Sequence, residues 1–209
     1  MKQVKPWILV MWSGGLDSTG VVYKLLTDPE YEDYNIHVHS MRLQNVENRA
    51  GAEFEATMKM KKWFENNCRG FEFTRSAHDY TSMGNNFIWD MDFCAFMAAQ
   101  ICRCTFKTYT HVAMGRTATD LETVHANFHE RMRRAQAVVD AVYLIEKTKT
   151  RPEYIFPVID MTKKEIWEML PEDLRQHTWS CRFPTLDEKS NWIPCNECPT
   201  CKEIQDVHL

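Results

Sequence analysis

A glycine-rich segment near the N-terminus is the first candidate for chemistry in this 209-residue chain. It reads WSGGLDSTG over residues 12–20 and holds three of the seven glycines. Glycines without a Cβ let backbone N–H groups close on an oxyanion, and hydroxyl groups and a helix start add further donors. The segment lies between an apolar run and a helical pattern, so it predicts a phosphate-binding loop. The residues predicted to form this phosphate-binding loop are Trp12, Ser13, Gly14, Gly15, Leu16, Asp17, Ser18, Thr19 and Gly20.

The spacing distinguishes this loop from two common nucleotide-binding loops. The Gly-Lys-Ser/Thr ending of a Walker A loop does not follow at the required distance, and the GxGxxG turn of dinucleotide-binding folds is not present. A generic glycine turn before a helix remains the alternative interpretation.

Four cysteines near the C-terminus form the second candidate site: Cys181, Cys195, Cys198 and Cys201. Overlapping Cys-x-x-Cys turns can bring thiolates onto one ion, and four thiolates complete a closed structural zinc site. The same spacing also suits an iron–sulfur cluster or a redox-active dithiol. We expect structural Zn²⁺ that holds the C-terminal segment on the rest of the chain. The other four cysteines are scattered through apolar patterns and are expected to be buried.

The pattern between these two sites alternates strands with helices. Apolar or alternating runs predict strands over 7–12, 35–43, 71–76, 110–115 and 153–158. Helical periodicity predicts helices over 18–27, 50–67, 87–104 and 123–147, and the Thr162–Glu165 capping box begins another that runs to Met169. Right-handed crossovers turn this order into an α/β fold with a doubly wound, mostly parallel five-stranded sheet. We expect a nucleotide-binding domain over residues 1–178 and a packed cysteine segment over 179–209.

Composition restricts the classes of partner. The formal net charge of −4 and pI of about 6.1 argue against direct, charge-driven nucleic-acid binding. No apolar run approaches the roughly 20 residues that span a bilayer, so no membrane partner is expected. The apolar N-terminal run leads straight into the glycine-rich loop without a cleavage site, so we interpret it as a strand and expect a cytoplasmic protein.

The Ser-Gly-Gly-x-Asp-Ser-Thr pattern resembles the PP-loop of the ATP pyrophosphatases, which cleave ATP between the α and β phosphates. The loop, "MTKKEIWEML" and "TWSC" followed by "CNECPTC" together resemble the 7-cyano-7-deazaguanine synthase family of queuosine biosynthesis. That resemblance implies ATP, Mg²⁺ and Zn²⁺ as cofactors, with Asp17 helping to organise Mg²⁺, and a homodimer. It also implies a reaction: the carboxylate of 7-carboxy-7-deazaguanine is adenylated, ammonia gives the amide, and a second activation gives the nitrile.

Two basic residues are further candidates, one through this resemblance and one through its position in the chain. Lys163 stands at the family's lysine position and is predicted to neutralise phosphate charge, although a solvated helix position is the alternative. Arg116 follows a predicted strand and a glycine, where a guanidinium could bind a phosphate or a carboxylate through two hydrogen bonds. A role at the surface is the alternative for Arg116.

The acceptor side of the predicted pocket departs from the family pattern. Where the family reads close to Pro-Gly-Arg-Asn, this chain retains only Gly84 and Asn86, and Asp120 alone matches a later recognition stretch. These residues and Arg116 are the predicted acceptor site. The departures leave open a different deazapurine, an amide end product or a different acid.

Two other functions are compatible with the sequence. A PP-loop tRNA-modifying sulfurtransferase also adenylates a base and can use Cys-x-x-Cys, but the acidic pI and the lack of an added basic domain argue against it. A non-enzymatic zinc-ribbon interaction module would explain the cysteines but would leave the glycine-rich loop without a role.

Overall fold

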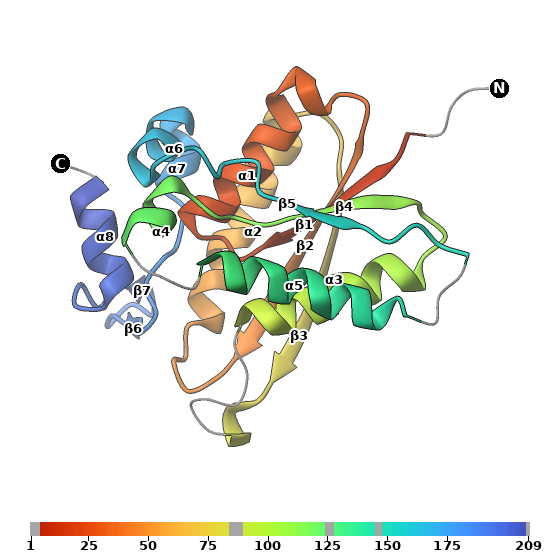
Figure 1. The fold of residues 1–209 in the computed structure, drawn as a ribbon. Coiled ribbons are helices and arrows are strands. Elements are labelled where there is room, and N and C mark those ends of the chain that lie inside the picture. The colour runs from red at the N-terminus through yellow and green to blue at the C-terminus, as the bar shows by residue number, and fades with distance from the viewer. Residues whose placement is uncertain (1–4, 84–89, 124–127, 145–147, 208–209) are drawn as a thin grey trace.

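The computed structural model describes residues 5–83, 90–123, 128–144 and 148–207. Five strands form one sheet in the order β3-β2-β1-β4-β5, and all four neighbouring pairs run parallel (Figure 1). The strands are β1 (Trp7–Trp12), β2 (Asn35–Gln44), β3 (Glu72–Asp79), β4 (Tyr109–Ala113) and β5 (Glu153–Ile155). The predicted doubly wound α/β fold is therefore confirmed.

Helices cover both faces of this sheet (Figure 1). One layer contains α1 (Leu16–Thr27), α2 (Ala50–Asn67), α6 (Lys163–Met169) and α7 (Glu172–Arg175), and the other contains α3 (Asp90–Cys104) and α5 (Phe128–Val142). Alternation along β1 serves both layers: Ile8 and Val10 pack in the first core, and Leu9 and Met11 pack in the second. Burial on both faces explains why β1 reads as a continuous apolar run.

The C-terminal segment adds a small hairpin and a helix to one end of the sheet. The hairpin pairs β6 (Thr185–Leu186) with β7 (Trp192–Ile193), and α8 (Pro199–Val207) follows it. Figure 1 shows α8 on the side of the molecule where α4 (Ala118–Thr123) and α6 lie, and α6 contacts α8 directly. This end of the sheet is also where β1 leads into α1, so the C-terminal segment lies near the glycine-rich loop.

The long helix predicted over 123–147 is confirmed over Phe128–Val142 as α5, while residues 124–127 and 145–147 lie outside the described ranges. A short helix that was not predicted, α4, precedes it and ends at Thr123. The start of α4 has a local cause, because Thr117 and Asp120 cap each other. The Thr117 N–H donates to Asp120 Oδ2 at 3.1 Å, and the Asp120 N–H donates to Thr117 Oγ1 at 3.2 Å.

Two smaller expectations also need correction. The fifth strand ends at Ile155 rather than at residue 158, because the chain turns there and the Ile159 N–H donates to the Phe156 carbonyl oxygen at 3.0 Å. Among the four scattered cysteines, Cys102 is buried as expected but Cys104 is exposed. None of the helices in the described ranges is both long and apolar enough to cross a membrane.

Candidate functional site

The glycine-rich loop connects β1 to α1 and has the backbone geometry that its glycines permit. Gly14 has a φ of +85°, which disfavours residues with a Cβ, and Gly15 is the N-cap of α1. Hydroxyl groups close the turn: Ser13 Oγ and Ser18 Oγ lie 3.0 Å apart, and Ser18 Oγ donates to the Gly15 carbonyl oxygen at 3.2 Å. The loop therefore offers backbone N–H groups and hydroxyls at the start of a 12-residue helix.

The nine predicted loop residues divide into two groups. Those that line a cavity of about 430 Å³ are Ser13, Gly15, Leu16, Asp17 and Ser18. The others support the loop from behind. The buried Trp12 indole donates to Thr19 Oγ1 at 3.1 Å, and Gly20 packs against Ile166 so closely that a Cβ would lie 2.6 Å from its Cγ2.

Charged side chains converge on this cavity from several other parts of the chain. The cations are Arg49, Arg116, Lys163 and Arg182, and the carboxylates beside Asp17 are Glu53, Asp120 and Glu203. The cations come from the N-cap of α2, the β4–α4 loop, α6 and the cysteine segment. Such a mixture of both charge signs suits a triphosphate accompanied by a divalent cation.

Asp17 lies in the first turn of α1. Burial raises the pKa of its carboxyl to about 6, while the Lys163 ammonium partly offsets the shift. Its Oδ1 is buried and has no hydrogen-bond partner in the described structure, while Oδ2 lies 3.9 Å from Lys163 Nζ. A buried carboxylate oxygen without a hydrogen-bond partner, on a residue that lines a polar cavity, is suited to a cation.

Lys163 lies inside the cavity wall rather than in solvent, since its side chain is only 12% exposed. Its Nζ contacts Glu203 Oε2 at 2.5 Å and lies 3.9 Å from Asp120 Oδ1. Burial acts to lower the pKa of Lys163, but the surrounding carboxylates outweigh it and raise the pKa. The ammonium is therefore charged at neutral pH.

Arg116 also lines the cavity, directly after Gly115. Its Nη2 contacts Met91 Sδ at 2.8 Å, and no carboxylate of the described residues forms an ion pair with it. A thioether is a weak acceptor, so this guanidinium retains most of its hydrogen-bonding capacity for an anion. Asp120, the other described acceptor candidate, faces the same cavity from α4. Gly84 and Asn86 lie outside the described residues.

A second cavity of about 330 Å³ opens beside the first, where β2 and β3 end against α2. Phe54 and Phe73 supply apolar walls, and the Arg75 guanidinium lies 5.0 Å from the centre of the Phe54 ring. Ser13 and Glu53 line both cavities, so the two are neighbours at the glycine-rich loop. A molecule with a flat, largely apolar ring and a chain of phosphates could place the ring in the second cavity and the phosphates in the first.

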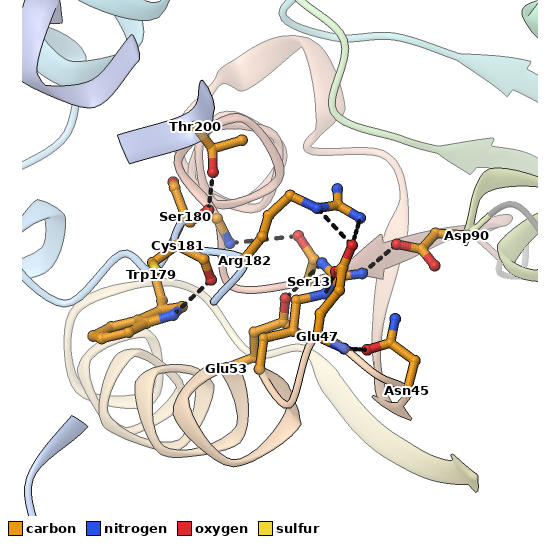
Figure 2. A network of polar contacts seen from close by, with 12 residues as sticks. Ser13, Asn45, Glu47, Glu53, Asp90, Trp179, Ser180, Cys181, Arg182 and Thr200 are labelled. Carbon is orange, nitrogen blue, oxygen red and sulfur yellow. Dashed lines mark hydrogen bonds and ion pairs between the residues drawn. The ribbon is translucent and has the colours of Figure 1, made fainter. Parts of the chain in front are cut away.

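An ion-pair network joins these cavities to the cysteine segment (Figure 2). Arg49 pairs with Glu47 and Glu53 at 2.8 Å each and also with Asp90, and Arg182 Nη2 contacts Glu47 Oε1 at 2.5 Å. Burial raises the pKa of Glu53 to about 7, although Arg49 opposes the shift. Four of the cavity's charged residues were not predicted from the sequence: Arg49, Glu53, Arg182 and Glu203. The acid–base spacing of Arg49 and Glu53 on one helical face was the only local signal for any of them.

The four C-terminal cysteines gather as predicted. Their Sγ atoms all lie within 4.8 Å of one another, with 3.6 Å between Cys181 and Cys195 and 4.0 Å between Cys195 and Cys201. Cys181, Cys198 and Cys201 are buried. Four thiols held this close together without disulfides have the arrangement needed to bind a metal ion.

A parallel α/β sheet with the Ser-Gly-Gly-x-Asp-Ser-Thr loop after its first strand gives this chain the fold and the loop of the PP-loop ATP pyrophosphatases. The family model described as Queuosine biosynthesis protein QueC matches residues 90–206, which is more than half of the chain. The chain belongs to this family. A comparison with curated proteins finds no match.

One solved structure supports the fold independently. It is the U34-tRNA thiolase NcsA from Methanococcus maripaludis with its [4Fe-4S] cluster, which matches with a TM-score of 0.51 and 16% sequence identity. The match covers 99% of this chain and 64% of that one, so this chain spans less than two thirds of the thiolase's length. At this identity the likeness shows the shared fold.

Proposed function

We propose that this protein is an ATP-dependent carbon–nitrogen ligase that adenylates the carboxylate of a 7-deazapurine acid and passes the acyl group to ammonia. The observation that supports it most is one cavity that unites the PP-loop with Asp17, Lys163 and Arg116. The acceptor would be 7-carboxy-7-deazaguanine or a close relative. The family match supports the same reaction class.

The chemistry requires charge control more than a protein nucleophile. A carboxylate oxygen of the acid attacks the α-phosphorus of ATP, the bond to the bridging oxygen of the β-phosphate breaks, and pyrophosphate leaves. Ammonia then attacks the acyl carbon, AMP leaves with the former carboxylate oxygen, and the nitrogen loses a proton to give the amide. To form the nitrile, the amide oxygen is adenylated in turn and departs with AMP while the nitrogen loses two protons. Lys163 and Arg116 would hold the anionic groups that approach and leave.

The cavities fit the two parts of ATP. Adenosine would lie in the smaller cavity between Phe54 and Phe73, and the phosphates would lie over Ser13 and Gly15 in the larger one. Mg²⁺ fits the orphaned Oδ1 of Asp17 and would supply positive charge to the pyrophosphate that leaves. Asp120 Oδ1 faces the same space.

The cysteine cluster fits Zn²⁺ better than an iron–sulfur cluster. A tetrahedral ion with Zn–S bonds of about 2.3 Å separates its sulfurs by about 3.8 Å, close to the 3.6 and 4.0 Å found here. In a cubane each thiolate binds a different iron, which spreads the sulfurs further apart. With all four cysteines as ligands no open position remains, so we assign the ion a structural role.

The test measures pyrophosphate release with candidate acceptors. Release that requires a deazapurine acid and ammonium, with amide or nitrile detected by mass spectrometry, supports the ligase. Release that requires tRNA, with sulfur transferred to it, would favour the sulfurtransferase of which the thiolase neighbour is an example. The absence of any ATP turnover, with Asp17→Asn indistinguishable from wild type, would favour an interaction module. A homodimer and a cytoplasmic location also stay proposals, and light scattering after gel filtration tests the first.

A further inference from the structure

A carboxylate from the cysteine segment reaches the predicted ATP site. Glu203 lies on α8, two residues after the cluster cysteine Cys201, and it lines the larger cavity. Its Oε2 lies 2.5 Å from Nζ of Lys163, across 40 residues of sequence. No local pattern would place these two groups together.

The distances around Lys163 are unequal in a way that matters for cation binding. Charged N–H···O contacts are about 2.7–2.9 Å long, so the 2.5 Å contact with Glu203 is direct. Asp17 Oδ2 and Asp120 Oδ1 each lie 3.9 Å from the same ammonium, which is too far for a hydrogen bond. The lysine hydrogen-bonds Glu203 on α8 and stays beyond hydrogen-bond distance of both aspartates.

The two aspartates keep oxygens available for a cation. Asp17 Oδ1 has no hydrogen-bond partner in the described structure. Asp120 Oδ2 accepts a hydrogen bond from the Thr117 N–H. This bond caps α4 and fixes the orientation of the carboxylate. Lys163 already pairs with both aspartates at 3.9 Å, and a move about 1 Å closer would turn these pairs into direct hydrogen bonds that compete with a divalent cation.

We propose that Glu203 is a positioning residue that holds Lys163 away from Asp17 and Asp120, so that both aspartates stay available to Mg²⁺. This inference rests on the proposed function, since it assumes that the cavity binds Mg²⁺ with ATP. It also couples the two sites, because the cluster determines where α8 begins. Thr200 Oγ1 donates to the Ser180 carbonyl oxygen at 2.6 Å, and Cys198 and Cys201 flank that contact.

The test measures cation binding directly, with Mn²⁺ as the probe. Mn²⁺ is titrated into the full-length protein with α,β-methylene-ATP, which cannot be cleaved between the α and β phosphates, and free Mn²⁺ is followed by electron paramagnetic resonance. Glu203→Gln keeps the shape and removes the charge, and we expect it to raise the Kd of Mn²⁺ about tenfold. Glu203→Asp retains the charge and should restore most of the affinity. Asp206→Asn removes a carboxylate from an exposed position of the same helix and should change nothing.

Two results would overturn the inference. One is an unchanged Mn²⁺ Kd in Glu203→Gln when the four-thiolate site keeps its metal. The other is tighter nucleotide binding by that variant without Mn²⁺, which would make Glu203 a competitor of phosphate rather than a positioning group. If wild type binds neither Mn²⁺ nor the ATP analogue, the proposed function itself fails, and the two failures are therefore distinguishable.

Discussion

The backbone N–H of Trp179 donates a 2.9 Å hydrogen bond to the carbonyl oxygen of Gly14. The segment that leads into the cysteine cluster is thus bonded to the PP-loop itself. A Cβ built on Gly15 would lie 3.6 Å from the Trp179 carbonyl oxygen, so the two backbones are also in close contact. The cysteine cluster and the proposed nucleotide cavity are therefore in contact, and we expect changes at one to affect the other.

Removal of the cysteine-bound metal should loosen the PP-loop. We expect the metal-free protein to bind α,β-methylene-ATP about tenfold more weakly, because Trp179 and Arg182 lose the framework that places them at the cavity. Hydrogen exchange over residues 13–19 should speed up, and zinc added back should reverse both effects. Unchanged exchange in these amides after metal loss would contradict the coupling.

Asp17→Asn should separate stability from function. The raised pKa of about 6 means that the buried carboxylate is costly when ionised, by at most about 3 kcal/mol at neutral pH. That cost already includes the attraction of Lys163, so asparagine should raise the free energy of unfolding by about 1–3 kcal/mol at neutral pH. ATP turnover should be lost. Urea denaturation and a pyrophosphate assay measure the two effects, and a variant less stable than wild type would contradict the raised pKa of Asp17.

The stability gain of Asp17→Asn should depend on pH in a defined window. Between the unfolded value of 3.8 and the folded value of about 6, native Asp17 binds more protons than the unfolded chain, so its contribution to stability falls as pH rises. The advantage of the variant should be largest above pH 6 and vanish near pH 4. His37 and His39, with pKa values lowered to about 4 by burial, act in the opposite direction but cancel in this comparison. A gain that is independent of pH from 4 to 7 would contradict the assignment.

The sequence predicted the helices and strands whose bounds are set by neighbouring residues. The bounds of β1 and α2 match the structure, and Thr162 and Glu165 form the predicted reciprocal cap at the start of α6. The short helix α4 was not predicted, because the Thr117–Asp120 cap does not follow the Ser/Thr-x-x-Glu/Gln form. Periodicity alone was enough for α2, whose N-cap Arg49 makes no side-chain cap hydrogen bond.

The sequence predicted the parts of the candidate site that lie within short segments, but not the residues that join the site through tertiary contacts. The PP-loop and the cysteine cluster each lie within one stretch of sequence, so their spacing reveals them. The groups that complete the cavity come from tertiary contacts, such as Glu203 against Lys163 and Arg182 against Glu47, which are separated by 40 and 135 residues. Lys163 was predicted from the family motif, but nothing in the sequence near Glu203, Arg182 or Glu47 marks these three as members of the same site.

Arg116→Ala should weaken anion binding with little effect on folding. Its guanidinium lines the cavity, and among the described residues its hydrogen-bond partner is the Met91 sulfur alone. Its loss therefore leaves no carboxylate unpaired. We expect kcat/KM for pyrophosphate release to fall roughly 10- to 100-fold, and Arg116→Lys should recover only part of it because lysine lacks the two-pronged geometry. Arg133→Ala, at a side chain 77% exposed, is the matched control. Equal losses in both variants would indicate a nonspecific charge effect.

Gly115→Ala should displace the PP-loop helix, because this glycine packs directly against its backbone. A Cβ at residue 115 would lie 2.7 Å from the Ser18 nitrogen and 2.9 Å from the Asp17 carbonyl carbon, both backbone atoms that cannot move aside alone. We expect a loss of about 1–3 kcal/mol in the free energy of unfolding, as in other overpacked sites. Binding of α,β-methylene-ATP should weaken as well, since α1 and the loop shift together. Gly70→Ala is the matched control, because a Cβ there meets nothing within 4 Å. Calorimetric unfolding and nucleotide titration of both variants measure the difference, and a Gly115→Ala protein as stable as Gly70→Ala would show that the loop does not depend on this close contact.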